Sequence, residues 1–257
     1  MLNTPRSCRG MVTSPHHLAS QAGLDVLKAG GTALEAAVAT AAALAVVYPH
    51  MTGIGGDAFW LTMWPDGRVE TIDACGAAAQ RADAGFYHAA GLDAIPWRGP
   101  LAANTVAGTV SGWDMALAWS HEVAPGLPLG RVLRDAIYYA EQGVPVTASA
   151  ADITREKAGE LKDVRGFRDL FMPGGRLPQV GDILHNPRLA GTLRQLADEG
   201  LSSFYHGTVA RELAADLRDL GSPLALADLQ AHKASHQPAL HARIHGADLF
   251  NMAPPTQ

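Results

Sequence analysis

The sequence predicts an α+β fold in which helices cover sheets of antiparallel strands. The first 50 residues carry helical spacing, and the period then changes to strict alternation over residues 59–64. The turn sequence Pro65-Asp66-Gly67 lets a second strand return beside the first. Helices, then a hairpin, then helices with late strands argue against a parallel doubly wound sheet, in which strands and helices alternate.

Two helices are predicted before the hairpin. Residues 18–28 have apolar side chains at helical spacing and end in a lysine followed by Ala-Gly-Gly, which is typical of a helix end. The next helix begins at Thr32 and ends before Pro49; it is apolar almost all round, so we expect it to lie buried between two layers. Its apolar run over residues 36–47 is shorter than the roughly 20 residues that a membrane span needs. No membrane segment is therefore predicted.

Further elements follow the hairpin. Amphipathic helices are predicted over residues 132–140, 187–199 and 208–220, and a strand over residues 247–251. No internal repeat or low-complexity linker interrupts the chain. We therefore expect a single domain over residues 1–257.

Composition limits the class of protein. Hydrophobic residues make up 47% of the chain, which is enough for a large core. The net charge of -5 is spread over mixed acids and bases, so a small molecule or a protein is expected as partner, and no nucleic acid. Two cysteines without CxxC spacing and an N-terminus without an apolar signal region predict a cytoplasmic protein.

The glycine loop Gly53–Asp57 raises the question of phosphate binding. A dinucleotide-binding loop follows a strand and opens a helix, whereas this loop follows a helix and opens a strand. A tight turn that requires φ > 0 at its glycines, with Asp57 as a local backbone cap, is the favoured interpretation.

Histidine spacing raises the question of a metal site. His232 and His236 are four residues apart, as are His241 and His245, and on a helix each pair would share one face. Pro238 lies between the pairs, and no carboxylate or cysteine completes a ligand set. Solvated histidines are favoured, and no metal or other cofactor is predicted.

Nucleophilic chemistry has little support from the residues alone. The chain has no GxSxG motif, and the nearest charges to Cys75 along the sequence are Asp73 and Arg81. Without a local activator, Cys75 is interpreted as a small buried hydrophobe.

Several motifs in order carry a family resemblance. They are "HHLASQAGLDVLKAGG", "VVYPHMTGIGGDAF", "NTVAGTVSGW", "RDAIYYAEQGVPV", "LADLQAH" and "MAPPTQ", and they extend from about Arg9 to Gln257. Together they resemble the γ-glutamyltranspeptidase family of N-terminal nucleophile hydrolases.

The resemblance implies a four-layer αββα sandwich made by a precursor that cuts itself into a large and a small subunit. The N-terminal threonine of the small subunit would be the nucleophile, with its own α-amine as general base and backbone amides holding the oxyanion. This chain ends at Gln257, before such a threonine. We therefore expect a large-subunit part, without a catalytic residue, that is incomplete and inactive without the small subunit; a higher oligomer is left open.

One departure from the family bears on the substrate. Where γ-glutamyl enzymes carry an arginine that binds the glutamyl α-carboxylate with two prongs, this chain has Cys75, and Gly76 stands in place of the following glutamate. The missing charge-assisted contact is worth on the order of 1.5–3 kcal/mol. We do not expect γ-glutamyl recognition by the usual contact.

The variant motifs are most similar to the oxamate amidohydrolase branch, which implies cleavage of oxamate, a small amide, to oxalate and ammonia. A γ-glutamyltransferase or hydrolase and a cephalosporin-type acylase remain as alternatives, and a non-catalytic truncated fragment is an alternative of another class. The oxamate carboxylate would need donors, and Arg98, Arg81 and the amide of Asn104 are candidates beside Cys75 and Gly76. Either arginine can instead be a surface ion-pair residue.

Overall fold

The computed structural model describes residues 4 and 6–256 of the chain. They divide into two compact units, one of Met1–Gly53 and Trp119–Gly200, the other of Ile54–Ala118 and Leu201–Gln257. Helices and strands both occur, and every strand pairing in the described part is antiparallel, as the sequence predicts. The expectation of a single domain stays a prediction.

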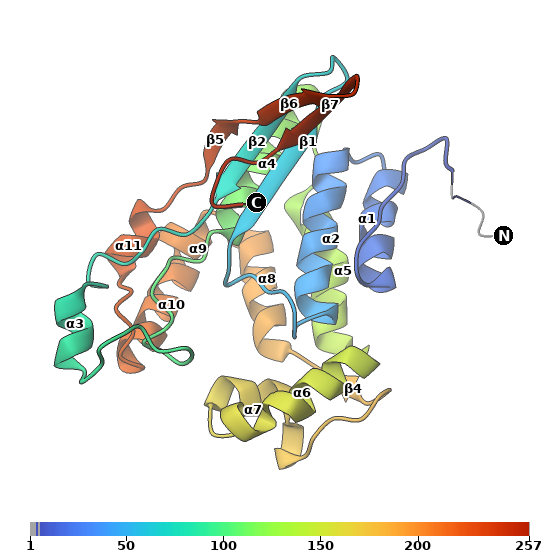
Figure 1. Cartoon of the computed structure of the whole chain (residues 1–257). Helices are drawn as coiled ribbons and strands as arrows, with labels where there is room; N and C mark the ends of the chain where they lie inside the picture. The colour runs from blue at the N-terminus through green and yellow to red at the C-terminus, as the bar shows by residue number, and fades with distance from the viewer. Residues whose placement is uncertain (1–3, 5, 257) are drawn as a thin grey trace. The chain divides into compact units, whose positions relative to one another are not determined.

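Helices build the first unit. Its core is α2 packed against α1 and α5, with α8 packed on α5 (Figure 1). The elements are α1 (His17–Lys28), α2 (Ala33–Val47), α5 (Leu129–Gln142), α6 (Ala148–Leu161), α7 (Arg165–Phe171), the short 3-10 helix η1 (Pro173–Gly175), α8 (Pro187–Glu199), and the paired strands β3 (Val144–Pro145) and β4 (Ile183–Leu184).

The predicted burial of the second helix, α2, is confirmed, and its first turn explains where it begins. The Thr32 hydroxyl accepts a bond from the Glu35 N–H at 3.2 Å, and the Glu35 carboxylate accepts one from the Thr32 N–H at 2.7 Å. Glu35 is fully buried and also accepts from the Leu127 N–H at 2.6 Å. The carboxylate thus has partners for both oxygens, which makes its burial tolerable.

A three-stranded sheet of order β1-β2-β5 and several short helices build the second unit. The elements are β1 (Ala58–Met63), β2 (Val69–Ala74), α3 (Ala84–Ala89), α9 (Ser203–His206), α10 (Thr208–Asp219), α11 (Leu226–Ala231), β5 (Ser235–Pro238), β6 (Leu240–Ile244) and β7 (Ala247–Asn251). The helix α4 (Thr109–Val123) begins in this unit. Ile72, Val110, Trp113 and Leu229 are at most 1% exposed and form part of its core.

The predicted hairpin is confirmed as β1 and β2, which pair from Ala58 opposite Ala74 to Met63 opposite Val69. The turn is closed by Gly67 at φ 87°. The apolar side chains of Phe59, Leu61 and Met63 lie on one face of β1 and are 37%, 48% and 67% exposed. In the described part of the chain this apolar strand face is uncovered.

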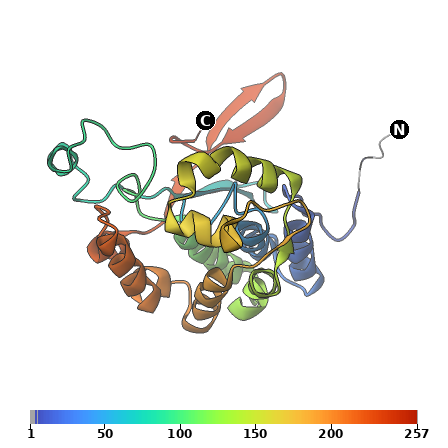
Figure 2. The same ribbon diagram turned by 90° about the horizontal axis from the view of Figure 1, so that it is seen from below.

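The predicted late strand is β7, which pairs with β6 in a hairpin of its own. Nearly all of its residues are exposed, and it extends away from α10 and α11 of the same unit (Figure 2). No helix in the described residues has the length and apolar character needed to cross a membrane.

Candidate functional site

The carboxylate of Asp57 joins the start of β1 to the end of β2. Because Ala58 pairs with Ala74, Asp57 lies opposite the residues that follow β2. Its Oδ1 accepts a hydrogen bond from the Gly76 N–H at 2.8 Å, and its Oδ2 accepts one from the Cys75 thiol at 3.5 Å. We call the set Asp57, Asp73, Cys75 and Gly76 the Asp57 corner.

The interpretation of Asp57 as a local cap is wrong, since its carboxylate holds a backbone 19 residues away. The reason is the strand register, which a reading of neighbours along the sequence does not include. The local cap at this point is Asp73, whose Oδ1 accepts from the Cys75 N–H at 2.8 Å.

Electrostatics keep the Cys75 thiol neutral. Burial, followed by the charge and hydrogen bond of Asp57 and the charge of Asp73, raises its pKa above the ordinary value. A thiol with a raised pKa is a weak nucleophile and acts as an S–H donor. The interpretation of Cys75 as a small buried hydrophobe is wrong, because the side chain is only half-buried and its thiol donates to the Asp57 carboxylate.

Close backbone approach explains the glycines of this region. A Cβ on Gly76 would lie 1.7 Å from the Val106 carbonyl oxygen, and a Cβ on Gly108 would lie 1.9 Å from the Ala74 carbonyl oxygen. The two segments are held together by a bond from the Val106 N–H to the Ala77 carbonyl at 2.9 Å. The glutamate that the resemblance places at position 76 does not fit this backbone.

The first residue of α4 fixes the glycine loop. The Thr109 hydroxyl lies 2.8 Å from the Gly56 carbonyl oxygen and 3.0 Å from that of Asp57, and the Thr109 N–H also donates to Gly56 at 2.9 Å. The loop is thus held by the side chain and the N–H of Thr109. The expectation of φ > 0 at the loop glycines is wrong, since none of Gly53, Gly55 and Gly56 has a positive φ.

Two aromatic side chains lie beside the corner: Tyr205, which the sequence analysis did not single out, and His232, which it wrongly expected to be solvated. The buried Tyr205 hydroxyl donates to the Ala107 carbonyl at 2.7 Å and accepts from the Ser111 N–H at 2.9 Å, and burial raises its pKa. The His232 ring lies 5.4 Å from the Tyr205 ring, and its buried Nε2 has no partner among the described residues. Burial lowers the pKa of His232 although Asp57 and Asp73 oppose this, so the imidazole is held towards its neutral form.

The charges acting on both Cys75 and His232 are those of Asp57 and Asp73, and both are negative. The Asp57 corner therefore offers two carboxylates and a neutral thiol, and the imidazole of His232 near it adds no positive charge. It is a poor place for a substrate carboxylate.

The other predicted site residues lie outside this corner's contacts. The Asn104 amide donates to the Tyr87 hydroxyl at 3.1 Å, and that hydroxyl donates to the Leu101 carbonyl at 3.2 Å. Arg98 is exposed in the loop that follows α3. Arg81 lies over the Phe86 ring, with 5.5 Å between its Cζ and the ring centroid. The contacts of Cys75 and Gly76 go to Asp57, so the structure brings together only these two of the candidates.

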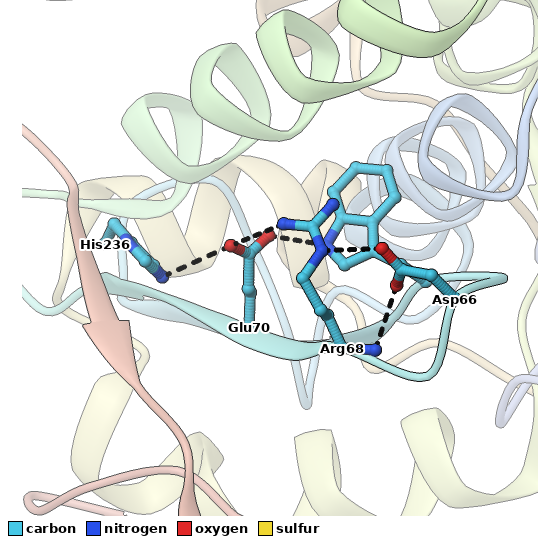
Figure 3. Close-up of polar contacts among 5 residues, drawn as sticks. Asp66, Arg68, Glu70 and His236 are labelled. Atoms are coloured by element: carbon cyan, nitrogen blue, oxygen red, sulfur yellow. Dashed lines mark hydrogen bonds and ion pairs between the residues drawn. The ribbon is translucent and has the colours of Figure 1, made fainter.

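A second polar cluster lies at the tip of the β1–β2 hairpin (Figure 3). Arg68 bonds Asp66 at 2.8 Å and Glu70 at 3.2 Å, and His236 on β5 approaches Glu70 at 3.9 Å. The arginine also lies over the Trp64 ring. Because these groups neutralise one another on an exposed surface, the cluster stabilises the turn modestly and leaves no reactive group.

The histidines considered as metal ligands are separated by the fold. His236 faces Glu70 from β5, whereas His232 ends α11 beside Tyr205, and His241 bonds Asp248 at 2.8 Å within the β6–β7 hairpin. In the part of the chain that the structure describes, no three histidine, cysteine or acidic side chains are grouped to hold a metal ion.

A model of the gamma-glutamyltranspeptidase family matches residues 19–257, and the chain belongs to this family. The oxamate amidohydrolase proenzyme of Klebsiella pneumoniae is 51% identical over 252 residues, which are 98% of this chain and 47% of that protein. The chain thus spans about half the length of the curated relatives it matches.

Solved structures agree with this assignment. The γ-glutamyltranspeptidase of Helicobacter pylori is similar with a TM-score of 0.90 and 28% identity, over 99% of this chain and 72% of that one. The cephalosporin acylase of Bacillus halodurans has a TM-score of 0.86 and 33% identity, over 97% of this chain and 47% of that one. The resemblance drawn from the motifs is confirmed.

Proposed function

We propose that this chain is the N-terminal, large-subunit part of a self-processing amidohydrolase that cleaves a small amide, oxamate, to oxalate and ammonia. The observation that carries the proposal is the 51% identity to an oxamate amidohydrolase proenzyme over 98% of the chain. The nucleophile is a threonine that begins the small subunit. Its hydroxyl attacks the amide carbonyl while its own amine accepts the proton, the C–N bond breaks as that proton passes to the leaving ammonia, and water then hydrolyses the acyl-enzyme ester to oxalate.

The negative charge of the Asp57 corner argues against a γ-glutamyl substrate. A glutamyl α-carboxylate at Cys75 would face the carboxylates of Asp57 and Asp73 without the arginine that the family resemblance implies. Losing a charge-assisted contact disfavours binding by on the order of 1.5–3 kcal/mol. Cys75 and Gly76 then serve as a compact wall of the substrate pocket.

Oxamate also carries a carboxylate, which needs a donor away from the Asp57 corner. We assign this role to Arg98, an exposed guanidinium in the loop after α3. Asn104 supports the same loop through Tyr87, whose hydroxyl bonds the Leu101 carbonyl. Replacing Arg98 with alanine should raise KM for oxamate more than it lowers kcat, because the contact is made to the substrate before reaction.

The small subunit is the proposed partner and completes a four-layer αββα sandwich. The exposed face of Phe59, Leu61 and Met63 on β1 supports this, because an apolar strand face of this kind is normally covered. The two free cysteines fit a reducing cytoplasm. A higher oligomer is compatible with this arrangement.

The test compares substrates on the complete, processed protein. We expect ammonia release from oxamate with a kcat/KM well above that for a γ-glutamyl anilide. Hydrolysis of the anilide with no ammonia release from oxamate would replace this proposal with γ-glutamyl transfer or hydrolysis. Activity on a cephalosporin side-chain amide alone would favour an acylase, to which the similarity with the Bacillus halodurans enzyme points.

A further inference from the structure

Three arginines line a cavity of about 430 Å³ in the second unit. Arg211 and Arg218 come from α10, where they are seven residues apart and so face the same side of the helix. Arg81 comes from the segment after β2, more than 100 residues earlier in the chain. No acidic side chain is among the lining residues of this cavity in the described part.

The charge of the cavity is only partly neutralised. Arg218 pairs with Asp219 at 3.0 Å. Arg211 bonds the neutral hydroxyl of Thr208 at 3.0 Å, and Arg81 lies over a phenylalanine ring. Neither Arg81 nor Arg211 has an ion pair within the described residues. Because a guanidinium keeps its charge at all ordinary pH values, the cavity retains a positive charge that a bound anion would balance.

A buried carboxylate fixes the walls of the cavity. Asp228 is 6% exposed and accepts from the Gln80 N–H at 2.9 Å and from the Ala225 N–H at 2.8 Å. Gln80 precedes Arg81, and Ala225 lines the cavity itself. Two segments distant in sequence are thus held together at the cavity, which lowers the cost of ordering it around a ligand.

The apolar part of the lining limits the kind of ligand. Ala214, Ala215 and Leu224 line the cavity between the arginines. A volume of about 430 Å³ lies in the range of small-molecule sites. The ligand that fits this lining has an anionic carboxylate or phosphate group joined to a short carbon skeleton, since guanidinium groups match carboxylate and phosphate oxygens.

We propose that this cavity binds a small organic anion bearing carboxylate or phosphate groups, held by Arg81 and Arg211. The proposal does not rest on the substrate of the amidohydrolase reaction. It assigns a binding function to α10 and to the segment after β2.

Calorimetric titration of the complete protein with succinate and, separately, with inorganic phosphate tests the proposal. We expect at least one probe to bind saturably at concentrations below about 10 mM, as a site with a millimolar Kd should. The double variant Arg81→Gln, Arg211→Gln should weaken that binding at least tenfold, because it removes two charge-assisted contacts. The control is the double variant Arg134→Gln, Arg155→Gln, which also removes two positive charges, from exposed arginines on α5 and α6 that do not line the cavity.

Each outcome has a defined meaning. Binding of phosphate alone identifies a phosphorylated ligand, and binding of succinate alone identifies a carboxylate ligand. No saturable binding of either probe overturns the proposal, and so does equal binding by the wild type and the double variant. If the double variant unfolds, Arg211→Lys supplies the test, since it keeps the charge but loses the fork and should bind several-fold more weakly.

Discussion

Replacement of Gly76 by alanine probes the backbone contact at the Asp57 corner. The new Cβ would lie 1.7 Å from the Val106 carbonyl oxygen, about half of an ordinary contact distance. The obstructing atom belongs to the backbone, and Val106 is tied to Ala77 by a hydrogen bond of 2.9 Å. The segments can separate only by giving up bonds of this kind.

The magnitude follows from those contacts. The Val106–Ala77 bond and the bond from the Ala79 N–H to the Asn104 carbonyl, at 2.8 Å, would both be stretched. Each contributes about 1 kcal/mol, and overpacking adds a similar amount, so we expect a loss of about 3 kcal/mol in the free energy of unfolding. At roughly 2–4 °C per kcal/mol, the Tm should fall by about 6–12 °C.

The assay is thermal unfolding of the complete protein followed by circular dichroism. The matched control is Gly191→Ala in α8, where the added Cβ meets nothing within 4 Å and the helix should gain about 0.5–1 kcal/mol. A Gly76→Ala protein with the Tm of the wild type would refute the close approach and with it the geometry of the Asp57 corner.

Two further predictions concern titrating groups. In a Cys8→Ser background, Asp57→Asn should speed iodoacetamide alkylation of Cys75 several-fold at neutral pH, because the charge of Asp57 helps to raise the pKa of the thiol and the variant removes that charge; unchanged or slower alkylation would contradict this. Burial lowers the pKa values of His16 and His50, so below about pH 6.5 the unfolded chain takes up protons more readily than the folded one. The free energy of unfolding should therefore be highest above about pH 6.5 and should decrease as the pH drops below it. His16→Asn, whose side-chain oxygen can accept the Leu18 N–H in place of the His16 Nδ1, should lose less Tm between pH 7.5 and 5.5 than the wild type, and an equal loss would exclude His16 as a cause.

Local patterns predicted the elements that depend on local order. The β1–β2 hairpin follows from alternation and its Pro-Asp-Gly turn, and α2 from an apolar run that begins at Thr32 and ends before Pro49. The helix α8 (Pro187–Glu199) has the bounds that the sequence predicts.

Contacts between residues distant in sequence determine the features that local patterns did not predict. The helix α4 contains Gly112, and a glycine inside a helix normally lowers its stability. A Cβ added at this position would lie only 2.9 Å from the Trp60 indole nitrogen, so a larger residue does not fit. The glycine is there for packing against β1, which no local pattern reveals. In the same way, Asp57 meets Gly76 only because the strand register brings them together.

The candidate site was predicted in part. Cys75 and Gly76 were found through a family motif, and the structure places both against Asp57. His232 was considered only for its spacing from His236, whereas its position beside Tyr205 depends on α11 packing against α9, which carries Tyr205. Such neighbours are distant in sequence and become visible only in the fold.

The intact mass of the product of the complete gene shows whether this chain belongs to a self-processing amidohydrolase. We expect two chains, with a threonine at the N-terminus of the smaller one and ammonia release from oxamate by the pair. A single chain without a new N-terminal threonine and without amidohydrolase activity would refute the proposed function.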